Sequence, residues 1–162
     1  MATRARTERR TGGKVMAAAG WALLRLATAA MLAVDAWVHI DDAGSYDADR
    51  GGLISQGDLF RVETVVAGLV ALAVLVPWAQ PGWLRVACWA AALMVAGSAL
   101  GAVLLYRYVD VGVLGPLPDM YEPTWQVPGK LLSACAEAAA VILSLTGLVL
   151  DSRRALASRQ GS

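Results

Sequence analysis

Four long apolar segments, separated by polar stretches, make up most of the chain. They cover residues 15–40, 62–78, 83–106 and 130–150. An α-helix needs about 20 mostly apolar residues to cross the hydrocarbon core of a bilayer. Backbone groups inside a bilayer find no water to bind, so each crossing segment should be helical. The pattern therefore predicts an all-α fold, a four-helix transmembrane bundle over residues 15–150.

Two polar tails flank this membrane domain. Residues 1–14 are rich in arginine and lack an apolar run, so we expect a disordered basic tail. Residues 151–162 form a second polar tail. A cleavable signal peptide is the alternative explanation for a basic start that precedes an apolar stretch. The length of the first apolar segment, and its interruption by Arg25, favour a retained helix.

The composition agrees with a membrane protein. Of the 162 residues, 57% are hydrophobic and 17% are charged, and the mean hydropathy is +0.54. Soluble domains carry about 25% charged residues. The net charge of +1 offers no basic surface for nucleic acid. These values indicate a multi-pass protein of the cell membrane, in contact with lipid, and argue against nucleic-acid binding.

Basic residues are unevenly divided between the two sides that four crossings would create. One side would carry the basic residues of both tails and of one short link: Arg4, Arg6, Arg9, Arg10, Lys14, Arg85, Arg153, Arg154 and Arg159. The other side would carry Arg50, Arg61, Arg107 and Lys130. Because cytoplasmic loops are enriched in Lys and Arg, both termini are predicted to be cytoplasmic.

The two segments on the predicted outer side differ from flexible linkers. Residues 41–61 are rich in Asp and Gly, and residues 107–129 contain four of the six prolines together with tyrosine and tryptophan. Proline lowers the conformational entropy of a loop, and aromatic residues anchor at the membrane interface. We therefore expect ordered extracellular loops that cap the outer end of the bundle.

Ionisable residues inside the apolar segments are the main candidates for function, because burying them in a membrane is costly. Asp35 and His39 are one helical turn apart and share a face. Glu63 and Glu137 are expected near the same outer level. If these faces point inward, they form a polar cluster beneath the loops. The alternative is that they only hold helices together or are solvated at the outer surface.

Basic and aromatic residues at the same level extend this hypothetical ligand-binding site to Arg61, Arg107, Tyr106 and Tyr108. No catalytic motif is present, and no catalytic residue is predicted. His39 is the only histidine, and the two cysteines lie far apart in sequence. The sequence therefore predicts no metal site and no cofactor, since such sites usually need several of these ligands.

Other residues in the apolar segments allow narrower expectations. Arg25 either extends toward the cytoplasmic headgroups or pairs with an acid of another helix. Cys88 and Cys135 would lie near opposite faces of the membrane, so no disulfide is predicted between them. Gly97 and Gly101 form a small-residue face that packs either within the bundle or in a homo-oligomer.

Two blocks of the chain resemble small four-span integral membrane proteins of actinobacterial type that have no assigned function. The blocks are GGLISQGDLFRVE (residues 51–63) and YRYVDVGVLGPLPDMYEPTW (residues 106–125), and the resemblance covers about residues 20–150. In plan the chain is also similar to the DoxX-type four-helix proteins, in which a first-span arginine and a polar residue near its outer end are common. Arg25 and His39 occupy comparable places. This second resemblance implies a link with membrane redox chemistry.

The favoured function is non-enzymatic: an integral membrane protein that binds a partner or a small ligand through the polar cluster and the loops above it. One alternative is a proton-coupled small-molecule carrier that uses Asp35, Glu63 and Glu137 and acts as an oligomer. The other alternative is a DoxX-like accessory of membrane redox chemistry, for which the chain lacks a cysteine pair.

Overall fold

The structure is a computed structural model that describes residues 2–51, 53–76 and 81–160, with side chains from 15 to 157 within these ranges. Its elements are α1 (Ala2–Ala43), the short 3-10 helix η1 (Gly44–Tyr46), α2 (Gln56–Leu75), α3 (Gly82–Tyr108) and α4 (Lys130–Gln160). The described ranges contain no strand, only the isolated bridges Arg50–Ser55 and Leu114–Leu117. The predicted all-α fold is confirmed.

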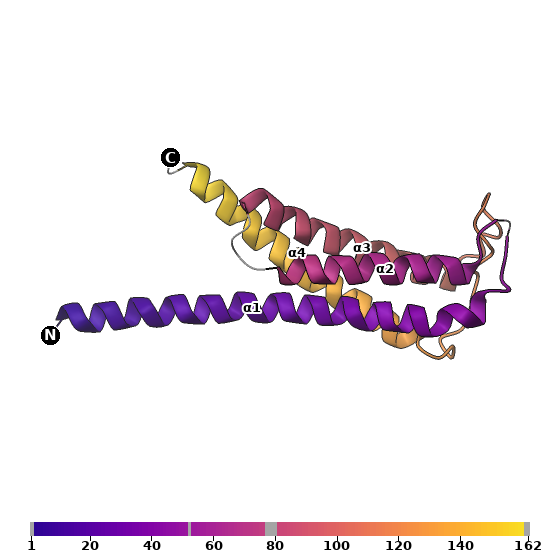
Figure 1. Cartoon of the computed structure of the whole chain (residues 1–162), viewed down its shortest axis with the longest axis horizontal. Helices are drawn as coiled ribbons and strands as arrows, with labels where there is room; N and C mark the ends of the chain where they lie inside the picture. Colours follow the sequence, from indigo (N-terminus) through magenta and orange to yellow (C-terminus); the bar gives the residue numbers. More distant parts are fainter. Residues whose placement is uncertain (1, 52, 77–80, 161–162) are drawn as a thin grey trace.

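The helices run along the long axis of the molecule, and both chain termini lie at the same end, which we call the terminal end (Figure 1). The opposite end carries residues 44–51, 53–55 and 109–129, which we call the cap. Helix α1 packs against α2 and α4, and α3 packs against the same two helices. The first and the last helix of the chain, α1 and α4, therefore lie against each other.

Three helical stretches are long and apolar enough to cross a membrane: Val15–Tyr46, Gly82–Tyr108 and Lys130–Ala157. Helix α2 is not among them, because Asp58, Arg61 and Glu63 lie near its beginning. The predicted second span also included residues 77–78, which are outside the described ranges. The three apolar helices are compatible with an integral membrane protein.

The helices extend further than the sequence predicted. Residues 2–14, expected to be disordered, have helical backbone within α1, and α4 continues to Gln160 through most of the expected second tail. Both extensions are rich in Ala and Arg, which favour helix. Lengthening an existing helix also avoids the unfavourable step of nucleating a new one.

Helix α2 begins at Gln56, earlier than the predicted Val62, because a capping box defines its start. Ser55 Oγ accepts a hydrogen bond from the Asp58 N–H (3.0 Å), and Asp58 Oδ2 accepts one from the Ser55 N–H (3.1 Å). Together these bonds satisfy donors that a helix start leaves open. The start of α2 lies against the end of α1, since a Cβ at Gly57 would collide with the carbonyl oxygen of Ala43.

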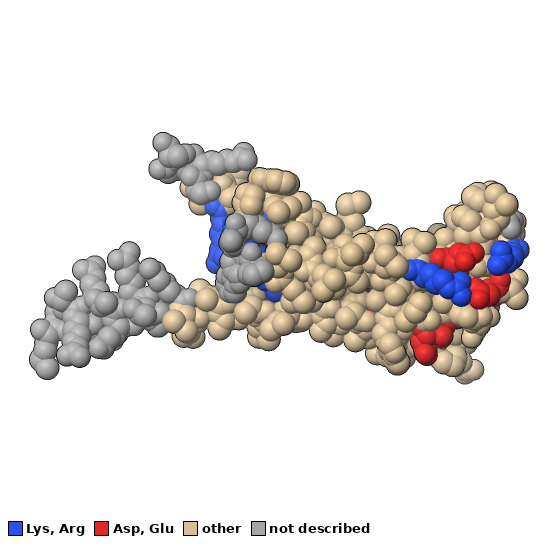
Figure 2. All heavy atoms as spheres, viewed as in Figure 1, with Lys and Arg blue, Asp and Glu red and all other residues tan. Residues whose placement is uncertain are grey.

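Small residues build the core. It contains Ala29, Ala71, Ala92, Ala96 and Ala140, together with Leu32, Val74 and the fully buried Trp89. Alanine allows close approach of helices, as is common between membrane helices. Large apolar side chains instead face outward, among them Leu69, Leu72, Met94 and Ile142. On the face drawn in Figure 2, the middle of the molecule shows no charged side chain, which fits a lipid-facing surface.

Candidate functional site

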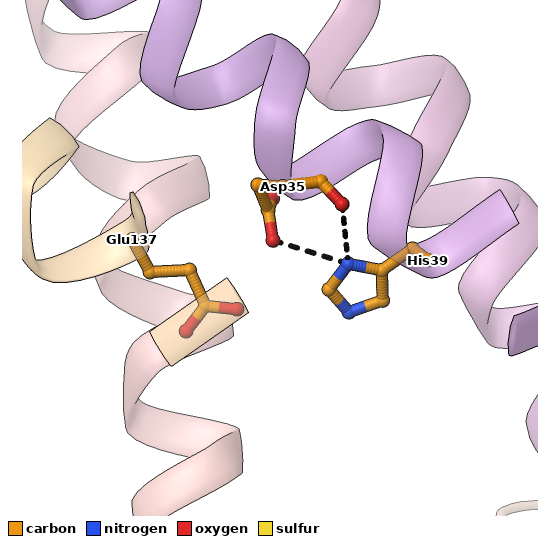
Figure 3. Close-up of side chains that lie close together, drawn as sticks. All are labelled: Asp35, His39 and Glu137. Carbon is orange, nitrogen blue, oxygen red and sulfur yellow. Dashed lines mark hydrogen bonds and ion pairs between the residues drawn. The ribbon is translucent and has the colours of Figure 1, made fainter. Parts of the chain in front are cut away.

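A buried polar cluster lies between α1 and α4, toward the cap. Asp35 and His39 come from α1, and Ser133 and Glu137 come from α4 (Figure 3 shows Asp35, His39 and Glu137). Asp35 is 1% exposed and Glu137 is fully buried. Each helix contributes two residues four positions apart, which places both on the side that faces the other helix. The structure thus brings together three of the residues that the sequence singled out.

Hydrogen bonds connect the members of this cluster. His39 Nδ1 lies 3.0 Å from the backbone oxygen of Asp35 and 3.1 Å from Asp35 Oδ1. Both neighbours are acceptors, so Nδ1 is the protonated nitrogen that donates to them. The imidazole and the ring of Phe60 also form a T-shaped contact, with 5.0 Å between ring centroids. These contacts fix the tautomer and the orientation of His39.

Ser133 bridges the two carboxyl groups. Its Oγ lies 2.8 Å from Asp35 Oδ1 and 2.8 Å from Glu137 Oε1. A hydroxyl group has one proton to donate, so it can donate fully to only one of these oxygens. The second contact is a full hydrogen bond only when the other carboxyl group carries a proton and donates to Ser133. The geometry therefore suits a cluster in which Asp35 and Glu137 share one proton.

Three carboxyl oxygens near the cluster are buried without a hydrogen-bond partner: Asp35 Oδ2, Glu63 Oε1 and Glu137 Oε2. Buried polar atoms are normally paired, so these mark a place where further donors can bind. Ligand atoms of Asp35, His39 and Glu137 also lie within 4.8 Å of one another, a set that could hold a divalent cation. The sequence analysis predicted no metal site because only histidine and cysteine were counted as ligands. It therefore did not foresee that two carboxylates and one histidine would lie together.

A cavity of about 360 Å³ lies between this cluster and the cap. His39, Glu63 and Ser133 form part of its polar lining. Most of its other walls are apolar or aromatic and come from α1, α2, α3 and the cap, including Leu59, Phe60, Val103, Tyr106, Leu117 and Met120. Asp35 and Glu137 lie next to this lining through Ser133. The cavity therefore combines an apolar body with a polar wall rich in acceptors.

The cap segment between α3 and α4 is held over the cavity by Trp125. The Trp125 ring lies 5.7 Å from both Arg107 Cζ and Lys130 Nζ. Lys130 Nζ also donates a hydrogen bond to the Glu122 backbone oxygen (2.5 Å), and the Glu122 N–H donates one to the backbone oxygen of Tyr106 (3.0 Å). These contacts tie the segment to the ends of both helices that it connects.

The remaining predicted site residues occupy different places. Tyr106 lines the cavity. Tyr108 is 65% exposed and lies beneath the Arg107 guanidinium, 5.0 Å away. Arg61 faces outward and binds both carboxylate oxygens of Asp47, at 2.7 and 2.9 Å, which holds the pKa of Asp47 below its usual range. Arg61 therefore stabilises the cap and does not line the cavity.

Arg25 follows neither of the two expectations for it. It is 6% exposed, and its guanidinium donates to the backbone oxygens of Val74 (2.6 Å) and Val76 (3.3 Å). These carbonyl groups lie at the end of α2, where no further helical N–H is available. Arg25 therefore binds the negative end of another helix instead of an acid or the lipid headgroups.

The structure also tests the expectations for the two cysteines and for the glycine face of α3. Cys88 and Cys135 form no disulfide, as predicted. A Cβ added at Gly97 or Gly101 would meet nothing within 4 Å. This glycine face therefore does not pack within the bundle, and its role in a homo-oligomer stays a prediction.

Ser133 and Asp151 were missed by the sequence analysis. Ser133 lies four residues before Glu137, and this spacing was a usable signal. Asp151 follows the last apolar segment and was assigned to the second polar tail, yet it is 2% exposed. It accepts a hydrogen bond from Trp89 Nε1 (2.9 Å), a partner 62 positions away that local sequence does not reveal.

Comparison with models of protein families, with curated proteins and with solved structures finds no match to this chain. The site must therefore be interpreted from its own geometry.

Proposed function

We propose that the chain is a four-span protein of the cell membrane, with cytoplasmic termini, that binds a small molecule in the cavity beneath its cap. The ligand would have an apolar body and a head group that donates hydrogen bonds, preferably a protonated amine. One observation carries this proposal: an apolar cavity of about 360 Å³ is polar where His39, Glu63 and Ser133 line it, beside two buried carboxyl groups.

The preference for a donating head follows from the unpaired oxygens. Leaving a buried acceptor without a donor costs about 1–3 kcal/mol, and more for a charged group. Glu63 lines the cavity and has one such oxygen, so we assign its carboxyl group as the acceptor for a ligand ammonium group. Phe60, Tyr46 and Tyr106 also line the cavity, so aromatic rings lie near a cation bound there. Lys130, the lysine of the lining, donates a hydrogen bond to the Glu122 carbonyl group and lies 5.7 Å from the Trp125 ring centroid, on the cap side of the cavity.

Binding of three probes with the same phenyl body tests this proposal. They are 2-phenylethylammonium, 2-phenylethanol and 3-phenylpropanoate, measured by equilibrium dialysis against the full chain in lipid nanodiscs. We expect the cation to bind most tightly. Glu63→Gln should weaken its binding about tenfold, because a charge-assisted hydrogen bond is lost.

Asp41→Asn is the matched control, since it removes an exposed carboxylate of α1 that does not line the cavity. Equal binding of the three probes, or equal losses in Glu63→Gln and Asp41→Asn, would show that the cavity does not select a donating head.

A proton-coupled carrier is the second candidate, and the position of Ser133 between two carboxyl groups favours it. A shared proton there could be exchanged for a bound cation. Uptake of radiolabelled benzylguanidinium, which stays charged, donates hydrogen bonds and crosses lipid poorly, can be measured in vesicles with an imposed pH gradient. A carrier should take up the probe faster with the gradient than without it, and Glu137→Gln should abolish the difference. Uptake equal to that of protein-free vesicles would exclude transport of this cation.

A further inference from the structure

A second cavity, of about 220 Å³, lies at the terminal end and shares no lining residue with the cavity beneath the cap. Its lining comes from three helices: Trp21 and Arg25 of α1, Arg85 of α3, and Asp151 and Arg154 of α4. The lining thus combines three guanidinium groups with one carboxylate. On the face drawn in Figure 2, the acidic side chains that are visible lie at the cap end, away from this cavity.

The carboxylate of this cavity is already occupied by donors. Asp151 Oδ2 accepts the hydrogen bond of Trp89 Nε1, and Oδ1 lies 3.5 Å from Arg85 Nε. One acid cannot neutralise three cations, and Asp151 also offers its oxygens to an indole. The lining therefore keeps a positive excess that an added anion can balance.

Each arginine is held by other contacts before any ligand binds. Arg25 is fixed by the carbonyl groups at the end of α2, and its Cζ lies 5.5 Å from the Trp89 ring centroid. Arg154 Cζ lies 4.2 Å from the ring centroid of Trp21. Guanidinium groups fixed in this way bind with less loss of side-chain entropy, and their planar donors match the oxygens of a phosphate.

We propose that this cavity binds a phosphate group, with Arg154 and Arg85 as its main donors and Arg25 as a buried positive charge behind them. The phosphate could belong to an anionic lipid or to a soluble molecule. The surroundings favour the lipid, because Trp21 lies beside the site and the adjoining parts of α1 and α4 are apolar. Indole rings commonly lie at the headgroup level of a bilayer, where acyl chains would follow those apolar surfaces.

Two neighbouring arginines provide a test with a matched control. Arg153 and Arg154 are adjacent and both exposed, but only Arg154 lines the cavity. The full chain in dodecyl maltoside is titrated with dioleoylphosphatidylglycerol, dioleoylphosphatidylcholine or inorganic phosphate. Bound lipid is counted by native mass spectrometry, and bound phosphate by equilibrium dialysis with a radiolabel. We expect Arg154→Gln to weaken binding about fivefold and Arg153→Gln to leave it unchanged.

The probes also separate the two sources of the phosphate. Binding of phosphatidylglycerol without inorganic phosphate would assign the site to a lipid, and binding of both would assign it to the phosphate group itself. The proposal is overturned if neither binds, if phosphatidylcholine binds as tightly as phosphatidylglycerol, or if both arginine variants lose affinity equally. Because Arg154 and Arg153 lie outside the cavity beneath the cap, these outcomes do not depend on ligand binding there.

Discussion

Replacing Asp35 with alanine is expected to lower the free energy of unfolding by about 3 kcal/mol, the upper end of the range for losing hydrogen bonds to a buried carboxyl group. The substitution removes one of the two carboxyl partners of Ser133 Oγ and one acceptor of His39 Nδ1. His39 keeps the backbone oxygen of residue 35 as a partner, which limits the loss. Unfolding of the purified protein by sodium dodecyl sulfate, followed by tryptophan fluorescence, measures the change.

Two further variants identify the cause of that loss. Asp35→Asn keeps an oxygen that can accept from Ser133 and should restore most of the stability. Asp47→Ala breaks the exposed pair with Arg61, where water screens both charges, and should change stability far less than Asp35→Ala. If Asp35→Ala and Asp47→Ala were equally mild, the buried cluster would contribute nothing to folding.

Substituting Gly147 with alanine should destabilise the protein by about 2 kcal/mol, as is typical of overpacking a filled core. An added Cβ would lie 2.6 Å from Trp89 Cε3. Trp89 is 1% exposed, and its ring cannot turn away without losing the hydrogen bond to Asp151. The same unfolding titration measures this effect.

Gly97→Ala is the control for the helix preference of alanine itself. Its Cβ would meet nothing within 4 Å, so it should stabilise the protein by about 0.5–1 kcal/mol. The two glycine substitutions are thus expected to have opposite signs. If Gly147→Ala left the free energy of unfolding unchanged, Trp89 and α4 could move apart with little loss of packing energy.

The sequence predicted the cluster at Asp35, His39 and Glu137 because two simple quantities sufficed. Four-residue spacing set the shared face, and distance along each apolar segment set the depth. The same method failed for Asp151, which lies beyond the apolar segment and is buried only because α4 continues and meets Trp89. It failed for Arg25 because its partners are backbone oxygens, which every residue has.

Helix boundaries were predicted less well, for two different reasons. The start of α2 was signalled by Ser55 and Asp58, but hydrophobicity alone points to a later residue. The extensions of α1 and α4 depend on helix propensity in polar sequence, which a search for apolar segments ignores. The cavity itself depends on how the cap folds over Phe60 and Tyr106, and no local pattern in residues 109–129 specifies that contact.

The contacts of Trp125 determine which part of the loop between α3 and α4 can change in length. By anchoring the connection between α3 and α4 near its end, they divide one long loop into a longer and a shorter one. The entropy needed to close a loop grows only with the logarithm of its length. Residues around the exposed turn at Val113 and Leu114 can therefore lengthen or vary at little cost, while the part that follows Trp125 keeps its place. Lifting this segment from the helices requires the release of the Trp125 ring together with the Lys130–Glu122 and Glu122–Tyr106 hydrogen bonds, and it leaves the four helices packed.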